Sequence, residues 1–172
     1  MPYTLSTHSV NHANIAYAKG CWSFDVVKWR SHNIKLLDET CDIIGVGEIV
    51  ILYCSDKSSQ GIVMIGDIRD KSLVGMSVTD LWPGEFRNLL RVRWWNQPSL
   101  ISMDRIRNEM PFAQGRRRYW HLDLNILPLN FVQRNRNKLK SGDIYYLIDQ
   151  LPVDRTIDRV RNLLSDRKWI IQ

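Results

Sequence analysis

The sequence predicts one mixed α+β domain, in which a curved, mostly antiparallel sheet or open barrel is flanked by helices. Three observations predict this fold class. The chain has 172 residues and is 44% hydrophobic, which suits a single globular core that needs no disulfide or metal. Segments rich in β-branched residues alternate with helical patterns along the chain. No repeat, low-complexity tract or linker divides the sequence, so residues 1–172 are taken as one domain.

The first hundred residues contain the strand patterns. Runs of strong β-formers predict four strands, and the polar turn SDKSSQ joins the middle two as a hairpin. In the fourth strand, alternation places Leu90, Val92 and Trp94 on one face, with Arg91 and Arg93 on the other. The four strands are expected at residues 3–9, 48–54, 61–68 and 86–95.

Helical patterns lie between and after these strands. A short helix is expected at 11–19, which Asn11 can cap and Gly20 can end. Residues 119–126 alternate polar and apolar side chains, and Ser141 with Gly142 should stop the helical pattern that precedes them. Apolar residues at helical spacing predict four further helices, within 26–41, 102–108, 129–140 and 153–169.

The composition also limits the cellular location and the metal or cofactor sites that we expect. No stretch of about 18 apolar residues and no signal-like N-terminus is present, so we expect an intracellular protein without a membrane span. Cys21, Cys41 and Cys54 form no CxxC pair, and the four histidines show no ligand spacing. We therefore expect buried thiols, no metal site and no cofactor.

The net charge of +6 is unevenly distributed. Between residues 104 and 140, nine basic residues stand against three acidic ones. Such a stretch favours a polyanionic partner, because each neutralised phosphate releases counterions. A solvated basic face without a partner is the alternative. We assign phosphate contacts to Lys19, Arg116, Arg117 and Arg118.

Three segments resemble a YTH domain, a PUA-like family related to EVE and ASCH domains. STHSVNHANIAYAKGCWS (6–23) is similar to the family's opening, which ends in Lys-Gly-x-Trp-Ser. GEIVILYCSDKSSQGIVMIGDI (47–68) resembles its strand, hairpin turn and Gln-Gly strand, and LWPGEFRNLLRVRWW (81–95) its Trp-x-Gly-x-Phe-x-x-x-Trp segment. Their order and spacing match over about the first hundred residues. The family's Ser-Arg-Asp-Gly-Gln-Glu stretch has no clear counterpart, so the resemblance is to a divergent member.

The resemblance implies a reader that flips N6-methyladenine into an aromatic cage. Trp22 matches the first cage wall and Trp82 the second, while Ser23 matches the residue that accepts the methylated N–H. Base–aromatic stacking contributes about 1–3 kcal/mol, and indole walls also remove the methyl group from water. As a cage wall, Trp22 is expected to contribute to the ligand and little to the core.

For each remaining role in the site, more than one residue is a candidate. Where many relatives have a further aromatic, Ser77 stands here, which leaves Met76 or Leu81 as the apolar third wall. Asn14 aligns with the residue that reads a ring nitrogen of adenine, and Asn11 competes for that role. Both asparagines could instead only cap the helix. The other tryptophans are interpreted as core or sheet packing, with Trp95 the most exposed: Trp29, Trp94, Trp95, Trp120 and Trp169.

The resemblance does not decide whether the ligand is RNA or DNA. RNA is the family's usual ligand, but the chain could also be the DNA-targeting domain of a modification-dependent (McrBC-type) restriction system, with a motor or nuclease partner. A protein-interaction scaffold with a basic tail is an alternative of another class. No enzyme is predicted. GDIRDK (66–71) orders its acids and lysine as some nucleases do, but metal-dependent cleavage needs a separate upstream acid, so no catalytic residue is assigned.

Overall fold

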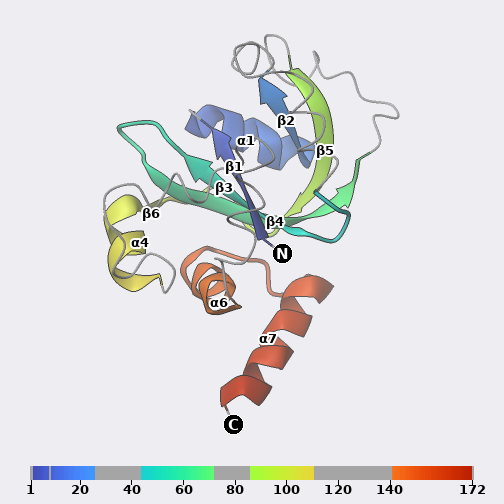
Figure 1. Cartoon of the computed structure of the whole chain (residues 1–172), viewed down its shortest axis with the longest axis vertical. Helices are drawn as coiled ribbons and strands as arrows, with labels where there is room; N and C mark the ends of the chain where they lie inside the picture. The colour runs from blue at the N-terminus through green and yellow to red at the C-terminus, as the bar shows by residue number, and fades with distance from the viewer. Residues whose placement is uncertain (1, 8, 26–43, 72–85, 111–140, 172) are drawn as a thin grey trace.

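The computed structural model describes residues 2–7, 9–25, 44–71, 86–110 and 141–171 (Figure 1). Within these ranges, six strands form one sheet and four helices pack around it. The strands are β1 (Pro2–Thr7), β2 (Cys21–Asp25), β3 (Ile49–Cys54), β4 (Gly61–Asp70), β5 (Phe86–Trp94) and β6 (Ile101–Ser102). The helices are α1 (Val10–Lys19), α4 (Met103–Glu109), α6 (Ser141–Gln150) and α7 (Asp158–Ile171).

The sheet has the order β1-β3-β4-β5-β2, and β6 pairs with the start of β4. Only β1 and β3 run parallel, while the other neighbours are antiparallel. The predicted class, a mixed α+β fold with a mostly antiparallel sheet flanked by helices, is therefore confirmed. The hairpin between β3 and β4 is also confirmed, with Ile51 opposite Ile65 in its register.

Both faces of the sheet are covered, and β3 shows why. All six of its residues are buried, and period-two alternation divides them between two hydrophobic clusters. Val50, Leu52 and Cys54 join the cluster that includes residues of α1. Ile49, Ile51 and Tyr53 join the cluster formed with α4, α6 and the start of α7.

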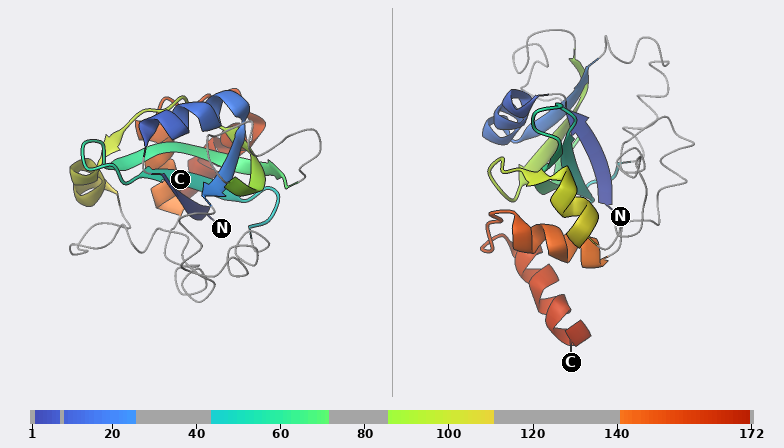
Figure 2. Two further views of the ribbon diagram at one scale, coloured as in Figure 1. Left: turned by 90° about the horizontal axis from the view of Figure 1, so that it is seen from above. Right: turned by 90° about the vertical axis from the view of Figure 1, so that its left-hand side faces the viewer.

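The views in Figure 2 place α1 against one side of the sheet. The helices α6 and α7 follow each other at one end of the molecule, and α7 extends away from the sheet (Figure 1). Among the residues that the structure describes, no helix has the length and apolar character needed to cross a membrane.

Helix α1 differs from the expectation at its first residue. The N-cap is Ser9, whose side-chain oxygen accepts a hydrogen bond from the backbone N–H of Asn11 at 3.1 Å. Asn11 is therefore inside the helix, and its predicted role as the cap is wrong. Serine and asparagine are about equally good caps, so composition alone could not choose between them. Gly20 ends the helix as predicted.

Helix α6 was not predicted. Ser141 and Gly142 were expected to stop a helix, yet the structure begins α6 at Ser141. Asp143 lies in its first turn, where a carboxylate interacts favourably with the helix dipole. Ile144 and Ile148, four residues apart in α6, are buried in the second cluster. This spacing was a readable signal for a helix.

The two other helices agree with their patterns. Ser102 caps α4 by accepting a hydrogen bond from the backbone N–H of Arg105. In α7, Val160 is buried and Leu164 packs partly buried against the second cluster, as does Ile157 directly before the helix, as their spacing predicts. The helices predicted within 26–41 and 129–140 and the alternating segment 119–126 lie outside the described residues.

Candidate nucleic-acid interface

The turn from α1 into β2 fixes the position of the Lys-Gly-x-Trp-Ser segment. Gly20 adopts a left-handed conformation with φ 62° and ψ 42°, and its N–H donates back to the carbonyls of Ala16 and Tyr17. Its own carbonyl accepts a hydrogen bond from the N–H of Val92 on β5 at 3.0 Å. The chain thus enters β2 immediately after the helix, with Trp22 paired opposite Leu90.

Trp22 is packed inside the protein. Only 5% of its surface is exposed, and it belongs to the cluster that includes Ala13, Ala16 and Leu90. The expectation that Trp22 contributes little to the core is therefore wrong. Its role as a cage wall stays a prediction. Burial is compatible with that role, because a wall on this strand must also be supported by the residues behind it.

Ser23 lies at an irregularity of the sheet. The β2–β5 register shifts between Trp22 and Phe24, which pair with Leu90 and Arg87. Between these two pairs β2 advances by two residues and β5 by three, so the extra residue of the bulge lies on β5, opposite Ser23. Bulges are frequent beside functional sites. Ser23 therefore faces the bulge and takes no part in the regular register on either side of it.

The polar residues of α1 separate into two groups along the helix. Asn11 and Asn14 are both exposed and three residues apart, so they are neighbours on one stretch of the helix surface. Lys19 is exposed at the last position, about 12 Å along the axis from Asn11. The structure thus brings Lys19 next to the Trp22–Ser23 segment and leaves the two asparagines nearer the other end.

Cys21 lies within the same segment and is a free, buried thiol. Burial raises the pKa of its thiol to about 11, although the nearby cations of Lys19 and Arg91 partly oppose this. Cys54 is also a free, buried thiol whose pKa burial raises. The prediction of small buried cysteines holds for these two, while Cys41 lies outside the described residues. Within the described ranges, no group of three His, Cys, Asp or Glu side chains could hold a metal ion.

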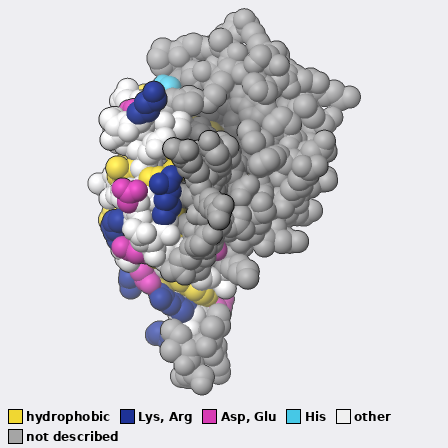
Figure 3. Space-filling view, turned by 60° about the vertical axis from the view of Figure 1, so that its left-hand side comes forward, with side chains coloured by type: hydrophobic (Ala, Val, Ile, Leu, Met, Phe, Trp, Pro, Cys, Tyr) yellow, Lys and Arg dark blue, Asp and Glu magenta, His cyan; other side chains and the backbone are white. Residues whose placement is uncertain are grey.

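Several predicted site residues lie outside the described residues. They are the second cage wall, both candidates for the third wall and the basic triplet: Trp82, Met76, Leu81, Arg116, Arg117 and Arg118. Their assignments stay predictions. For the described part of one face, Figure 3 shows basic side chains interspersed with acidic ones.

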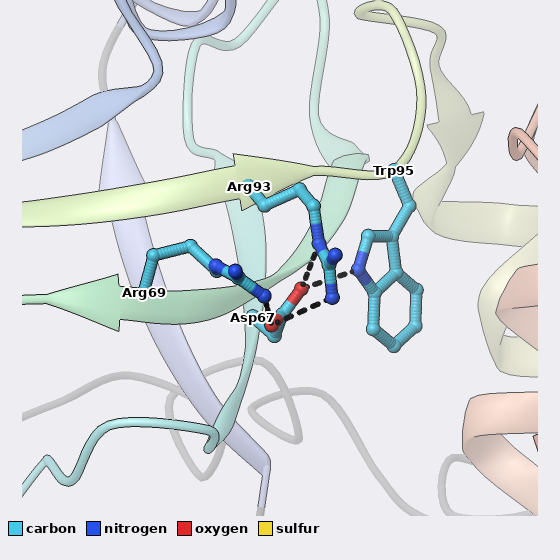
Figure 4. Close-up of polar contacts among 4 residues, drawn as sticks. All are labelled: Asp67, Arg69, Arg93 and Trp95. Carbon is cyan, nitrogen blue, oxygen red and sulfur yellow. Dashed lines mark hydrogen bonds and ion pairs between the residues drawn. The ribbon is translucent and has the colours of Figure 1, made fainter. Parts of the chain in front are cut away.

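The sequence interpretation missed a charged cluster on β4 and β5, drawn in Figure 4. Asp67 is buried, and Arg93 binds it through two hydrogen bonds, from Nε to Oδ1 at 3.0 Å and from Nη2 to Oδ2 at 3.2 Å. The indole N–H of Trp95 donates to Oδ1 at 2.7 Å. Arg69 Nη1 lies 3.9 Å from Oδ2. We call these four residues the Asp67 cluster.

The Asp67 cluster corrects one expectation. Trp95, expected to be the most exposed of the packing tryptophans, is only 1% exposed. It follows β5 and packs in the second hydrophobic cluster. The alternation that separates Arg93 from Trp94 was visible in the sequence. The pairing of Asp67 with Arg93 was not, because it depends on the β4–β5 register.

Comparison with solved structures finds similar chains that are YTH domains. The YTH domain of Zygosaccharomyces rouxii MRB1, in complex with N6-methyladenosine RNA, has 14% identity and a TM-score of 0.48 over 88% of each chain. The Toxoplasma CPSF4 YTH domain, bound to m6A-modified RNA, has 15% identity and a TM-score of 0.46, over 91% of this chain and 95% of its own.

The Pho92 YTH domain in complex with m6A is matched over a shorter region. It has 19% identity and a TM-score of 0.37, and the match spans 54% of each chain. No protein-family model matches the sequence, and no curated protein matches it. The chain is thus similar to YTH domains in structure at low sequence identity.

Proposed function

We propose that this chain is a non-enzymatic module that binds nucleic acid and reads N6-methyladenine in a cage that includes Trp22. The observation that carries the proposal is the segment after α1, where a tryptophan is followed directly by a serine that faces a β-bulge of β5. An indole beside backbone groups that regular pairing does not fix offers both the apolar wall and the hydrogen-bond acceptor that a methylated exocyclic amine needs.

The physical basis is the difference that one methyl group makes. A flipped base stacks against aromatic rings with about 1–3 kcal/mol per base, and this term is shared by adenine and methyladenine. Discrimination comes from the methyl group, whose burial contributes about 0.8 kcal/mol in apolar surroundings. A rigid wall strengthens this discrimination, because the protein then need not rearrange to close around the methyl group.

RNA is the ligand to test first. Its single-stranded bases are already unpaired, so capture requires no opening of a base pair. N6-methyladenosine RNA is also the ligand in the MRB1 and Toxoplasma complexes. Duplex DNA is the competing ligand, since a DNA-targeting module must spend a few kcal/mol to extrude the base.

The test is a fluorescence-anisotropy titration of the full chain with matched oligonucleotides. The probes are single-stranded RNA and duplex DNA of one sequence, each with and without one N6-methyladenine. We expect tighter binding of the methylated RNA. Equal affinities for both members of each pair would reject the reader function, and a preference confined to duplex DNA would reject RNA as the ligand.

Two matched variants locate the cage. Trp22→Phe should reduce the preference for the methylated probe, because a phenyl ring removes less of the methyl group from water than an indole does. Trp94→Phe is the control, since Trp94 lies in the same hydrophobic cluster and is 7% exposed. If both variants keep the wild-type preference while remaining folded, Trp22 is not part of the cage.

A further inference from the structure

Two arginines converge on one carboxylate oxygen in the Asp67 cluster. Arg93 Nη2 and Arg69 Nη1 lie 3.2 Å and 3.9 Å from the same Oδ2 of Asp67 (Figure 4). Asp67 is held on its other oxygen by Trp95, and its side chain is 5% exposed. A carboxylate fixed in this way orients the guanidinium of Arg93 before any ligand arrives.

Both arginines keep hydrogen-bond donors that Asp67 does not use. A guanidinium has five N–H donors, and Arg93 donates from Nε and Nη2 to the carboxylate of Asp67. In the part of the chain that the structure describes, neither arginine has another acceptor. The Arg93 side chain is 31% exposed and that of Arg69 56% exposed, so their free donors are accessible to a ligand.

The charge balance at this end of the sheet also favours an anion. Asp67 provides one negative charge for two guanidinium groups, which leaves one positive charge on the cluster. Among the described residues, Asp158 at the start of α7 also interacts electrostatically with Arg93. Its pKa is lowered mainly by its hydrogen bond with Arg161 and to a smaller extent by Arg93. Asp158 is thus paired mainly with Arg161 and interacts with Arg93 only more weakly.

We propose that Arg69 and Arg93 bind a phosphate group, with Asp67 and Trp95 as positioning residues. Guanidinium groups match the oxygens of phosphate with parallel hydrogen bonds, and two of them around one point fit a tetrahedral oxyanion. The phosphate belongs to the nucleic-acid backbone, and in this respect the inference rests on the proposed function. Such a contact positions the strand and does not read its sequence.

The main test compares two variants that each remove one positive charge. Arg69→Gln removes the more exposed arginine and leaves the buried Asp67–Arg93 pair intact. Lys57→Gln is the matched control, because Lys57 is exposed in the turn before β4. The eight residue-to-residue steps from Gly61 to Arg69 span roughly 26 Å, so Lys57 lies beyond the far end of the strand.

The measurement is the dependence of binding on salt. For Arg69→Gln, we expect about tenfold weaker binding of methylated and unmethylated RNA alike at low salt. The slope of log affinity against log salt should fall by about 0.7, the value for one phosphate on a single strand. Lys57→Gln should behave like the wild type. Equal slopes in all three proteins, or equal losses in both variants, would overturn the phosphate site.

The unmethylated probe separates this inference from the function on which it rests. If the wild type binds both RNAs equally and Arg69→Gln still lowers the slope, the methyl reader is rejected and the phosphate contact stands. Arg93→Lys provides a second arm, since lysine keeps the charge beside Asp67 but lacks the planar fork. The Arg93→Lys variant should bind RNA more weakly, with an almost unchanged slope of log affinity against log salt. Wild-type affinity in this variant would show that the Arg93 guanidinium does not bind the phosphate.

A further arm identifies the source of the phosphate. The Trp95 indole N–H is bonded to Asp67, so its ¹⁵N–¹H NMR signal, assigned with Trp95→Phe, reports on the cluster. We expect RNA to shift this signal at concentrations where inorganic phosphate has little effect. Saturation by inorganic phosphate without any shift from RNA would assign the site to free phosphate and overturn the backbone contact. No shift with either ligand would overturn the site.

Discussion

The indole N–H of Trp95 donates a hydrogen bond to the buried carboxylate of Asp67, over 2.7 Å from Nε1 to Oδ1. Trp94, its neighbour in sequence, donates from Nε1 to the neutral carbonyl of Ala16 at 3.1 Å. The two indoles face opposite hydrophobic clusters. They therefore allow a charge-assisted hydrogen bond to be compared with a neutral one in the same sheet.

We predict that Trp95→Phe destabilises the protein more than Trp94→Phe. Both variants lose similar apolar volume, but only Trp95→Phe removes a donor from a buried charge. A hydrogen bond to a charged group contributes about 1.5–3 kcal/mol, compared with about 0.5–1.5 kcal/mol for a neutral pair. Urea unfolding measures both free energies. Equal losses would show that Trp95 is not needed to satisfy Asp67.

Trp22→Ala tests the packing of the candidate cage. Trp22 is 5% exposed within a hydrophobic cluster, so truncation should lower the free energy of unfolding by about 3–5 kcal/mol. Binding data on Trp22→Ala therefore need a parallel thermal melt. A melting temperature equal to that of the wild type would show that the indole is not supported by the core.

The left-handed cap at Gly20 predicts a clear order of substitutions. At φ 62°, asparagine is tolerated, whereas a β-branched side chain is strained by about 1–2 kcal/mol or more. An added Cβ would lie 3.5 Å from the carbonyl oxygen of Val92, which is an ordinary contact. Gly20→Val should thus melt well below Gly20→Asn because of backbone strain. Similar melting temperatures would contradict a left-handed residue at this turn.

In β5, the sequence pattern was sufficient to predict which side chains are buried. In β5, the alternation of Leu90, Val92 and Trp94 with Arg91 and Arg93 is reproduced, since the first three are buried and the arginines half-buried. The pattern was informative because side chains on a strand alternate strictly between faces.

Other features depended on information that is not local. The start of α6 was missed because Ser141 and Gly142 were interpreted as a helix stop, whereas in the structure they are its first two residues. The Asp67 cluster requires the register in which Asp67 pairs with Arg93, and no pattern within a single strand sets it. In the candidate site, the spacing of Lys19, Gly20 and Trp22 predicted a helix end followed by the tryptophan. The burial of that tryptophan depends on its neighbours across the sheet.

The raised pKa of Cys21 predicts how stability changes with pH. The pKa of its thiol is about 11 in the folded protein, against an ordinary value of 9.0. The stabilising contribution is therefore complete below pH 9 and is lost as the pH rises from 9 to 11, where only the unfolded thiol ionises. Two pKa units correspond to roughly 2–3 kcal/mol.

The comparison of wild type with Cys21→Ala isolates this contribution, because tyrosine ionisation affects both proteins. Unfolding free energies measured with urea between pH 8 and pH 11 should converge for the two proteins as the pH rises. The wild type should also resist alkylation by iodoacetamide at pH 9 until it is unfolded. Parallel stability curves together with rapid alkylation would show that the thiol is accessible.

Met76 distinguishes a DNA ligand from an RNA ligand. The sequence SLVGMSVTDLW (72–82) carries apolar residues suited to wedge into a base stack, and extrusion from a duplex costs a few kcal/mol that such a wedge offsets. If duplex DNA is the natural ligand, Met76→Ala should weaken binding of methylated duplex more than that of a methylated single strand, by about tenfold or more. Anisotropy titrations of both probes give this ratio, with Val46→Ala, at an exposed site, as the control. Equal losses on the two probes would limit Met76 to the cage and favour RNA, and no binding of the duplex by the wild type would exclude the DNA function.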